Sequence, residues 1–270
     1  MLVIIRGGGD LATGVALRLY RSGMEVLICE TAVPTSIRRT VCFSEAVRLG
    51  ETMVEDVAAR RAALEEVPAL LAKGVVPVLV DPEAACIRSL HPDAVVDAIL
   101  AKRNLGTTID MAPIVVAAGP GFTAGADCHA VVETMRGHYL GRVIYEGSAM
   151  PNTNIPGLIG GYAGERVLRA PADGVFEGSK KIGDRVEAGD VAGYVAGEPM
   201  VCTIGGTLRG LLADGVPVTK GMKSGDVDPR CQEAHCRCAS DKALAVGGGV
   251  LEAILHFSRK NGEDHSWKTK

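Results

Sequence analysis

The sequence predicts an α/β protein, because valine- and isoleucine-rich runs alternate with helix-like stretches over residues 1–162. Strands separated by helices are typical of βαβ units, so we expect a Rossmann-like domain built on a parallel sheet. Turn residues bound the apolar runs, which predict strands over Leu2–Arg6, Glu25–Cys29, Val75–Val80 and Ile114–Ala118. We expect helices over Leu11–Ser22, Val54–Lys73 and Asp93–Asn104, with Pro68 kinking or splitting the second.

Residues 163–232 have a different texture, with short strands separated by glycine, aspartate and proline. An internal repeat is visible: residues 170–176 (APADGVF) lie 32 positions before residues 202–208 (CTIGGTL), and the same offset aligns Gly183 with Gly215 and Gly189 with Gly221. Two similar units of this length predict a small β-rich sandwich or barrel.

The repeat resembles a biotinyl/lipoyl-like, barrel-sandwich module. Carrier domains of that type present a lysine at the hairpin between their halves, whereas no lysine lies between Lys181 and Lys220 here. We therefore expect a packing or recognition module without an acceptor lysine. Residues 233–270 are expected to form a helix over Ser240–Lys260 and a polar tail, and to pack back on the α/β domain.

Composition narrows the functional classes. The net charge is -3, without the basic excess of a general nucleic-acid binder. The chain has neither a long apolar stretch that could span a membrane nor a signal-like start, since the apolar run Leu2–Ile5 before Arg6 is only four residues long. We expect a cytoplasmic protein whose eight cysteines are free thiols.

A glycine-rich loop follows the first strand. Gly7, Gly9 and Ala12 match G-x-G-x-x-A, with Gly8 between the two glycines and a strand before and a helix after the motif. Amides at the start of such a helix favour an anion, so this loop predicts a nucleotide or dinucleotide site. Asp10 would repel a phosphate, and we expect it to cap the helix instead. The alternative is a glycine turn that binds nothing.

Acidic and basic residues after the second strand fit the same site. Glu30 ends that strand, where an acid would hydrogen-bond ribose hydroxyls, and it would favour NAD over NADP. Arg38 and Arg39 could bind a phosphate of the nucleotide, or could equally be a solvated pair.

A second glycine loop follows the strand Ile114–Ala118. Gly119, Gly121 and Thr123 could cradle an anion at the same sheet edge. Reactive and polar side chains follow closely, with His129 and Glu133 four residues apart as on one helix face. We predict a functional site there with candidate catalytic residues Cys128, His129, Glu133, Arg136 and His138. Helix capping and surface polarity are the alternative.

A third cluster of reactive residues precedes the last helix. Cys231, His235, Cys236 and Cys238 lack the paired C-x2-C spacing of structural zinc sites, so we expect no metal there. The sequence leaves the reactivity of these thiols open.

Several long segments resemble the YqeB-type accessory proteins of the selenium-dependent molybdenum hydroxylase system. They are RGGGDLATGVALRLYRSG, APIVVAAGPGFTAGADCHAVVETMRGHYLGRVI, MKSGDVDPR and SDKALAVGGGVLEAIL. The resemblance implies a maturation factor that handles labile selenium or a molybdopterin cofactor, and whose partners are a molybdenum hydroxylase or its maturation proteins.

The sequence therefore supports two main hypotheses. The first is a maturation factor that binds a nucleotide, such as a molybdopterin cytosine dinucleotide, between the two glycine loops. The second is an NAD-dependent oxidoreductase. A non-catalytic docking scaffold is the third reading, and the oligomeric state is left open.

Overall fold

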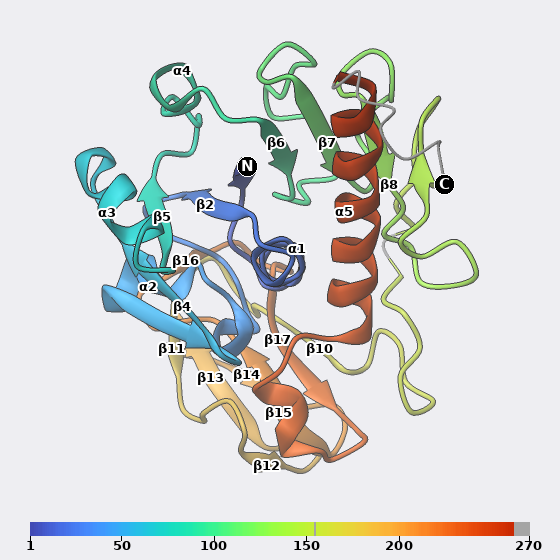
Figure 1. Cartoon of the computed structure of the whole chain (residues 1–270). Helices are drawn as coiled ribbons and strands as arrows, with labels where there is room; N and C mark the ends of the chain where they lie inside the picture. Colours follow the sequence, from blue (N-terminus) through green and yellow to red (C-terminus); the bar gives the residue numbers. More distant parts are fainter. Residues whose placement is uncertain (154, 262–270) are drawn as a thin grey trace.

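The computed structural model describes residues 1–153 and 155–261, and a nine-stranded sheet lies at its centre (Figure 1). The strand order is β3-β4-β5-β2-β1-β6-β7-β8-β9, and pairing is parallel from β4 to β8 with antiparallel pairs at both edges. The strands are β1 Leu2–Arg6, β2 Glu25–Glu30, β3 Glu51–Val54, β4 Val57–Arg61, β5 Val76–Val80, β6 Ala94–Asp97, β7 Ile114–Ala118, β8 Ala130–Val132 and β9 Val143–Ile144.

Both faces of this sheet are covered. Side chains alternate between two apolar layers, as in β1, where Val3 and Ile5 pack on one side and Ile4 on the other. The first layer lies under α1 (Asp10–Arg21), α2 (Glu45–Leu49) and α5 (Asp241–Asn261). The second lies under α3 (Val67–Leu71), α4 (Ile87–Leu90) and the loops after β7. Short 3-10 turns complete the elements: η1 Arg39–Val41, η2 Leu64–Glu66 and η3 Glu233–Cys236.

The predicted strands and the first and last helices are confirmed, but two predicted helices are wrong. Val54–Lys73 contains the last residue of β3, then β4, η2 and the short helix α3, with Pro68 in the first turn of α3. Asp93–Asn104 begins with β6, which lies between β1 and β7. Ala94–Asp97 is buried on both faces, and a short apolar run buried on both faces is typical of an inner parallel strand.

The repeat of residues 163–232 forms two four-stranded antiparallel sheets, ordered β10-β17-β15-β12 and β14-β13-β11-β16. Each strand of the first unit has a counterpart about 32 positions later in the second, and each sheet takes two strands from each unit. Gly174 and Gly206 share a positive φ, of 155° and 157°. The strands are β10 Val167–Arg169, β11 Gly174–Gly178, β12 Arg185–Val186, β13 Val191–Val195, β14 Glu198–Val201, β15 Gly206–Leu211, β16 Pro217–Val218 and β17 Lys223–Asp228.

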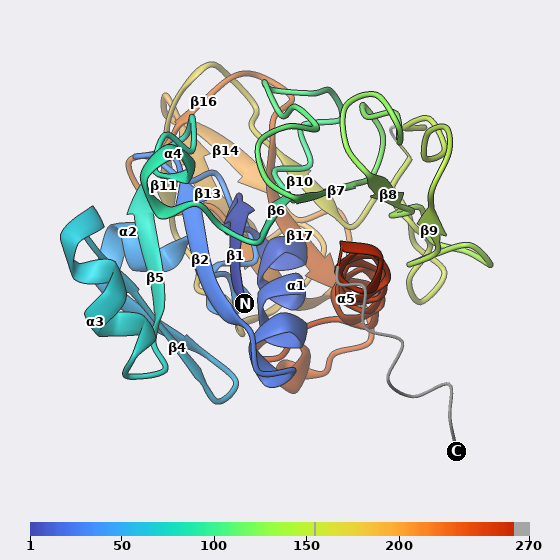
Figure 2. The ribbon, with the colours of Figure 1, turned by 45° about the horizontal axis from the view of Figure 1, so that its top comes forward.

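The chain returns from this β-module to the first sheet through α5. Figures 1 and 2 both show α5 beside α1, and side chains of α5 also pack against β7 and β8. The β-module is held to the segment after β2, because the Leu211 amide donates to the Ile37 carbonyl at 2.7 Å. None of the helices in the described ranges is both long and apolar enough to cross a membrane. The predicted polar tail after Lys260 falls largely on residues 262–270, outside the described residues.

Candidate functional site

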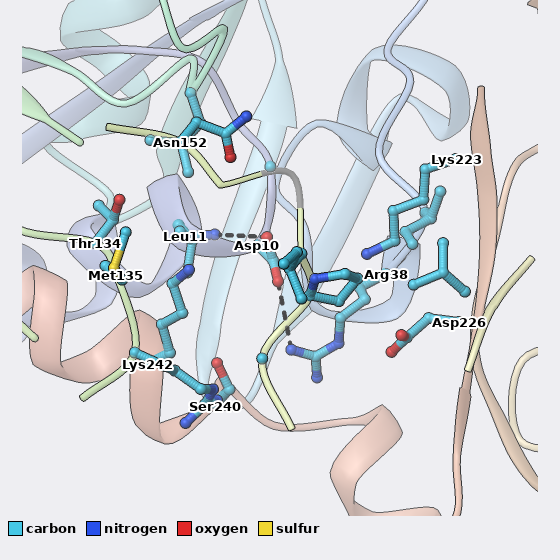
Figure 3. A pocket seen from close by; sticks show the side chains of 18 of the residues that line it. Asp10, Leu11, Arg38, Thr134, Met135, Asn152, Lys223, Asp226, Ser240 and Lys242 are labelled. Carbon is cyan, nitrogen blue, oxygen red and sulfur yellow. Dashed lines mark hydrogen bonds and ion pairs between the residues drawn. The ribbon is translucent and has the colours of Figure 1, made fainter. Parts of the chain in front are cut away.

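A pocket of about 910 Å³ lies between the carboxyl edge of the large sheet and the β-module (Figure 3). Because β1, β6, β7 and β8 are parallel neighbours, the loops that follow them meet at one edge. Gly9 and Asp10 line the pocket from the first glycine loop, and Pro120 lines it from the second. The two glycine loops therefore contribute to one composite site.

The lining of this pocket is strongly basic. Two acidic residues, Asp10 and Asp226, face eight basic ones, which come from both the α/β domain and the β-module. This excess of positive charge, in a protein whose net charge is -3, makes the pocket suited to an anion. The basic residues are Arg38, Lys102, Arg136, Arg166, Arg169, Arg209, Lys223 and Lys242.

The start of α1 forms one wall of the pocket. Gly9 is the N-cap and Asp10 is the first helical residue, so Asp10 does not cap the helix as predicted. Its carboxylate accepts a hydrogen bond from the Leu11 amide at 2.9 Å and pairs with Arg38 at 3.5 Å (Figure 3). Arg38 is 7% exposed and also donates to the His235 carbonyl, which joins the segment after β2 to the segment before α5.

The β-module supplies the opposite wall through β15 and β17. Asp226 accepts hydrogen bonds from Arg166 and Arg209, and Asp228 accepts from Arg209 and Arg230. Burial raises the pKa of Asp228, but the hydrogen bonds from Arg230 and the charges of Arg209 and Arg230 lower it more, so its net pKa lies below the usual range. Both carboxylates are 1% exposed, so this wall is a rigid charged cluster.

Two lysines face each other across the pocket in Figure 3: Lys223 from β17 and Lys242 from the start of α5. Neither has an ion-pair partner among the described residues. Desolvation lowers the pKa of both, and nearby carboxylates such as Asp10 offset this only in part. An anionic ligand would supply the missing counter-charge.

The internal repeat shows that this charge is not required by the β-module fold. Arg209, Lys223 and Asp226 lie on the second unit, and the positions 32 residues earlier hold Glu177, Val191 and Tyr194. The two units share a backbone arrangement, but only one carries the basic wall.

The rest of the first glycine loop lies behind the pocket. Gly7 has φ of +97°, and a Cβ there would lie 3.0 Å from the Ala98 carbonyl oxygen, so this turn requires glycine. The Gly8 amide donates to the Glu30 carboxylate at 2.8 Å. Ala12 is 1% exposed in the helix–sheet interface.

Glu30, at the end of β2, and Arg39, at the start of η1, both form hydrogen bonds within the protein. Glu30 accepts hydrogen bonds from the amides of Gly8 and Thr31, which occupies both its oxygens. Arg39 donates to the Leu211 carbonyl at 2.8 Å and so holds the β-module. Of the residues predicted to bind a cofactor, the structure brings Gly9, Asp10 and Arg38 into the pocket.

In the second glycine loop, Pro120 lines the pocket, whereas the predicted residues Gly119, Gly121 and Thr123 do not. A Cβ on Gly119 would lie 2.7 Å from the Thr134 hydroxyl, and one on Gly121 would lie 2.6 Å from the backbone of Arg103. Thr123 is exposed, and its amide donates to Asp127. These glycines allow close packing of neighbouring loops.

The candidate catalytic residues do not share a helix, because the segment from 130 to 132 is β8, and the helix-face prediction for His129 and Glu133 is wrong. His129 Nδ1 accepts a hydrogen bond from the Val115 amide. Glu133 is 2% exposed and accepts the amides of Met135 and Met150, two pocket-lining residues.

The remaining candidates differ in their access to the pocket. Arg136 lines it and pairs with Asp241 at 2.7 Å. His138 is exposed on the surface beside Tyr139. Cys128 is fully buried, and burial raises the pKa of its thiol to about 12, which opposes a reactive thiolate.

The described residues contain one cysteine-rich group with metal-like spacing, away from the pocket. The sulfurs of Cys29 and Cys86 are 3.4 Å apart, and the Asp81 carboxylate lies within 4.8 Å of both. Desolvation and the contact with Cys86 raise the pKa of Cys29, and Asp81 already accepts the Cys86 amide. The eight cysteines are free thiols, and Cys231, Cys236 and Cys238 each face a backbone carbonyl.

Sequence reasoning missed most of the basic lining. Lys223 lies in MKSGDVDPR and Lys242 in SDKALAVGGGVLEAIL, two segments noted above for a resemblance but not for their charge. Comparing the two repeat units position by position would have singled out Arg209 and Lys223, because these positions are basic only in the second unit.

The fold and the pocket define the class of protein: an α/β protein whose sheet edge and β-module together form a basic pocket. No family model matches the chain. It is 52% identical over 255 residues to a protein of Escherichia coli strain K12 described as uncharacterized protein YqeB, which confirms the resemblance to YqeB; the link to a molybdenum hydroxylase system stays a prediction. The alignment covers 94% of this chain and 47% of the relative, so the chain spans about half the length of that protein.

Two solved structures match the chain with low TM-scores. A succinylglutamate desuccinylase/aspartoacylase from Rhodobacter sphaeroides matches 23% of the chain and 21% of that structure, at 24% identity and a TM-score of 0.22. An aspartoacylase family protein from Mesorhizobium loti matches 84% of the chain and 83% of that structure, at 14% identity and a TM-score of 0.24.

Proposed function

We propose that this protein binds a phosphate-bearing ligand, a nucleotide or a molybdopterin-type dinucleotide, in the pocket between the sheet edge and the β-module. The observation that carries the proposal is the basic lining, in which eight positive side chains face two carboxylates. A volume of about 910 Å³ suits such a ligand, since small-molecule sites span roughly 300–1,000 Å³.

Two further observations support a ligand that carries a phosphate group. The first turn of α1 reaches the pocket at Gly9 and Asp10, and the start of a helix attracts negative charge. Lys223 and Lys242 are held opposite each other without a paired carboxylate among the described residues.

We further propose that the protein serves the maturation of a selenium-dependent molybdenum hydroxylase, within the cytoplasm. The resemblance to YqeB-type proteins motivates this role, and a molybdopterin cytosine dinucleotide is the ligand that would join it to the pocket. The β-module, which we regard as a barrel-sandwich of the lipoyl type without an acceptor lysine, would act as a fixed wall of the site.

NAD-dependent oxidation is less well supported by the geometry. Glu30, the residue expected to bind ribose, has both carboxylate oxygens engaged by the amides of Gly8 and Thr31. The segment after β2 packs directly on the first glycine loop, since a Cβ on Gly8 would lie 2.9 Å from the Ser44 amide nitrogen. Protein atoms therefore lie against the loop that would have to approach the NAD pyrophosphate.

Calorimetric titration with NAD, NADP, ATP, CTP and molybdopterin cytosine dinucleotide tests the proposal. We expect the cytosine-containing ligands to bind the wild-type protein, and Gly9→Val and Lys223→Gln to weaken binding by about ten-fold or more. Gly9 has φ of -68°, and its Cβ would lie 3.5 Å from the Ser36 hydroxyl, so the substitution narrows the pocket without straining the backbone.

Lys181→Gln is the matched control, because Lys181 is exposed and lies outside the pocket. Binding lost equally in Lys181→Gln would point to nonspecific charge. Binding of NAD alone would favour the oxidoreductase. Absence of binding at millimolar concentrations would contradict a ligand site and favour a docking scaffold.

A further inference from the structure

The loop from residue 98 to residue 107 lies between the two glycine loops. A Cβ on Gly7 would lie 3.0 Å from the Cα of Ile99, and one on Gly121 would lie 2.6 Å from the Cα of Arg103. Both contacts are with backbone atoms, which cannot rotate away. The two glycines therefore allow this third loop, which follows β6, to pack between the loops that follow β1 and β7.

A buried polar network anchors the loop. Arg6 is 2% exposed, and its guanidinium donates to the Thr107 hydroxyl and to the carbonyls of Leu105 and Pro82. The Thr107 hydroxyl in turn donates to Asp97 at 2.6 Å. Arg6 ends β1 and Asp97 ends β6, so the network joins two inner strands to the far end of the loop.

The loop is also tied within itself and to its neighbour. Asn104 exchanges hydrogen bonds with the backbone of Thr107, at 2.7 Å and 2.8 Å, and its amide lies 3.4 Å from the carboxylate of Asp127. A loop with this many internal anchors holds one backbone conformation.

That conformation is strained where the loop meets the pocket. Leu100 and Lys102 have φ of 59° and 62°, a region that side chains other than glycine and asparagine rarely adopt. Both residues line the pocket. Among the described residues, Lys102 has neither an ion pair nor a side-chain hydrogen bond. Strain that the surroundings maintain at a pocket is typical of binding loops.

We propose that the 98–107 loop is a preformed anion-binding loop, in which Lys102 binds a phosphate group of the ligand and Arg6 and Thr107 are positioning residues. This inference rests on the proposed function and deepens it. It places a ligand phosphate at the β6 end of the pocket, beside the carboxyl ends of β1 and β7. The start of α1 offers a second site of positive charge, the partial charge of the helix N-terminus. The ligand class is therefore one with more than one phosphate, a nucleoside di- or triphosphate or a dinucleotide.

Calorimetric titration of the full chain with CTP and with inorganic pyrophosphate tests the role of Lys102. Lys102→Asn removes the charge but suits the backbone, because asparagine tolerates this conformation. We expect it to raise the Kd for CTP about ten-fold, whereas Arg103→Gln, the same charge loss at an exposed neighbour that does not line the pocket, stays within about two-fold. Wild-type binding that Lys102→Asn leaves unchanged would overturn the inference alone, and wild-type protein that binds neither probe would overturn the proposed function with it.

Thr107 tests positioning separately. Thr107→Val removes the hydroxyl between Arg6 and Asp97, and Thr107→Ser keeps it. Measured well below the melting temperature, Thr107→Val should raise the Kd for CTP several-fold, and Thr107→Ser should restore it. A lowered Tm with an unchanged Kd would show a purely structural role and refute positioning.

Discussion

Three consecutive glycines in α5 should respond to alanine with opposite signs. A Cβ on Gly248 meets nothing within 4 Å, so Gly248→Ala should stabilise the protein by about 1 kcal/mol through helix propensity. A Cβ on Gly247 would lie 2.7 Å from the Gly14 carbonyl oxygen of α1, and one on Gly249 would collide with the Gly141 carbonyl oxygen. Overpacking against fixed backbone costs about 3 kcal/mol at its upper end, so each of these two variants should lose about 2 kcal/mol net.

Urea denaturation followed by circular dichroism measures the three variants against wild type. The midpoint should rise for Gly248→Ala and fall for Gly247→Ala and Gly249→Ala, with the slope unchanged. A fall of equal size in the urea midpoint of all three variants would mean that the close contacts of Gly247 and Gly249 are not what makes alanine unfavourable in α5. A rise in Gly247→Ala would mean that α1 and α5 do not approach closely.

Further predictions concern the first glycine loop, a buried thiol and acid stability. Gly7→Ala should destabilise by several kcal/mol because of its positive φ and close backbone neighbours, whereas Gly9→Ala should cost less than about 1 kcal/mol, as melting curves would show. In native protein, Ellman's reagent should react with Cys231 or Cys238 and spare Cys128, and rapid labelling of Cys128 would contradict its burial. The net pKa of Asp228 lies below its unfolded value of about 3.9, so its contribution to stability is complete above that value and is lost as the pH falls through the folded pKa. Urea midpoints at pH 6 and pH 3 should therefore differ less in Arg230→Gln than in wild type, and an equal difference would argue against this pair.

The local pattern of apolar and turn residues predicts an element correctly where that element is amphipathic or lies beside a clear turn. The strand Leu2–Arg6, the glycine loop and α1 follow from the sequence because their residues pack locally. The segment over Ala94–Asp97 could not be assigned in this way, because a short apolar run suits an inner strand and a buried helix equally. Its neighbours β1 and β7, far apart in sequence, decide the outcome.

The sequence predicted where the candidate site lies better than it predicted which residues line it. Two glycine loops at the ends of parallel strands indicated one sheet edge, and Gly9, Asp10 and Arg38 do line the pocket there. Lys102 and Lys223 could not be assigned, because their place depends on how a loop and a separate module close over that edge. Glu30 has the spacing of a ribose-binding acid, but its carboxylate accepts hydrogen bonds from two backbone amides. Spacing in the sequence does not determine which hydrogen-bond donor lies nearest in the fold.

The two repeat units of the β-module exchange strands. Since each sheet needs two strands from each unit, neither unit alone can complete a sheet. Two identical copies of one unit could form the same arrangement as a symmetric dimer, with two equivalent faces. Joining the copies in one chain removes the requirement that both faces be alike. One unit can therefore carry the basic wall, while the other has uncharged or acidic residues at the equivalent positions Glu177, Val191 and Tyr194.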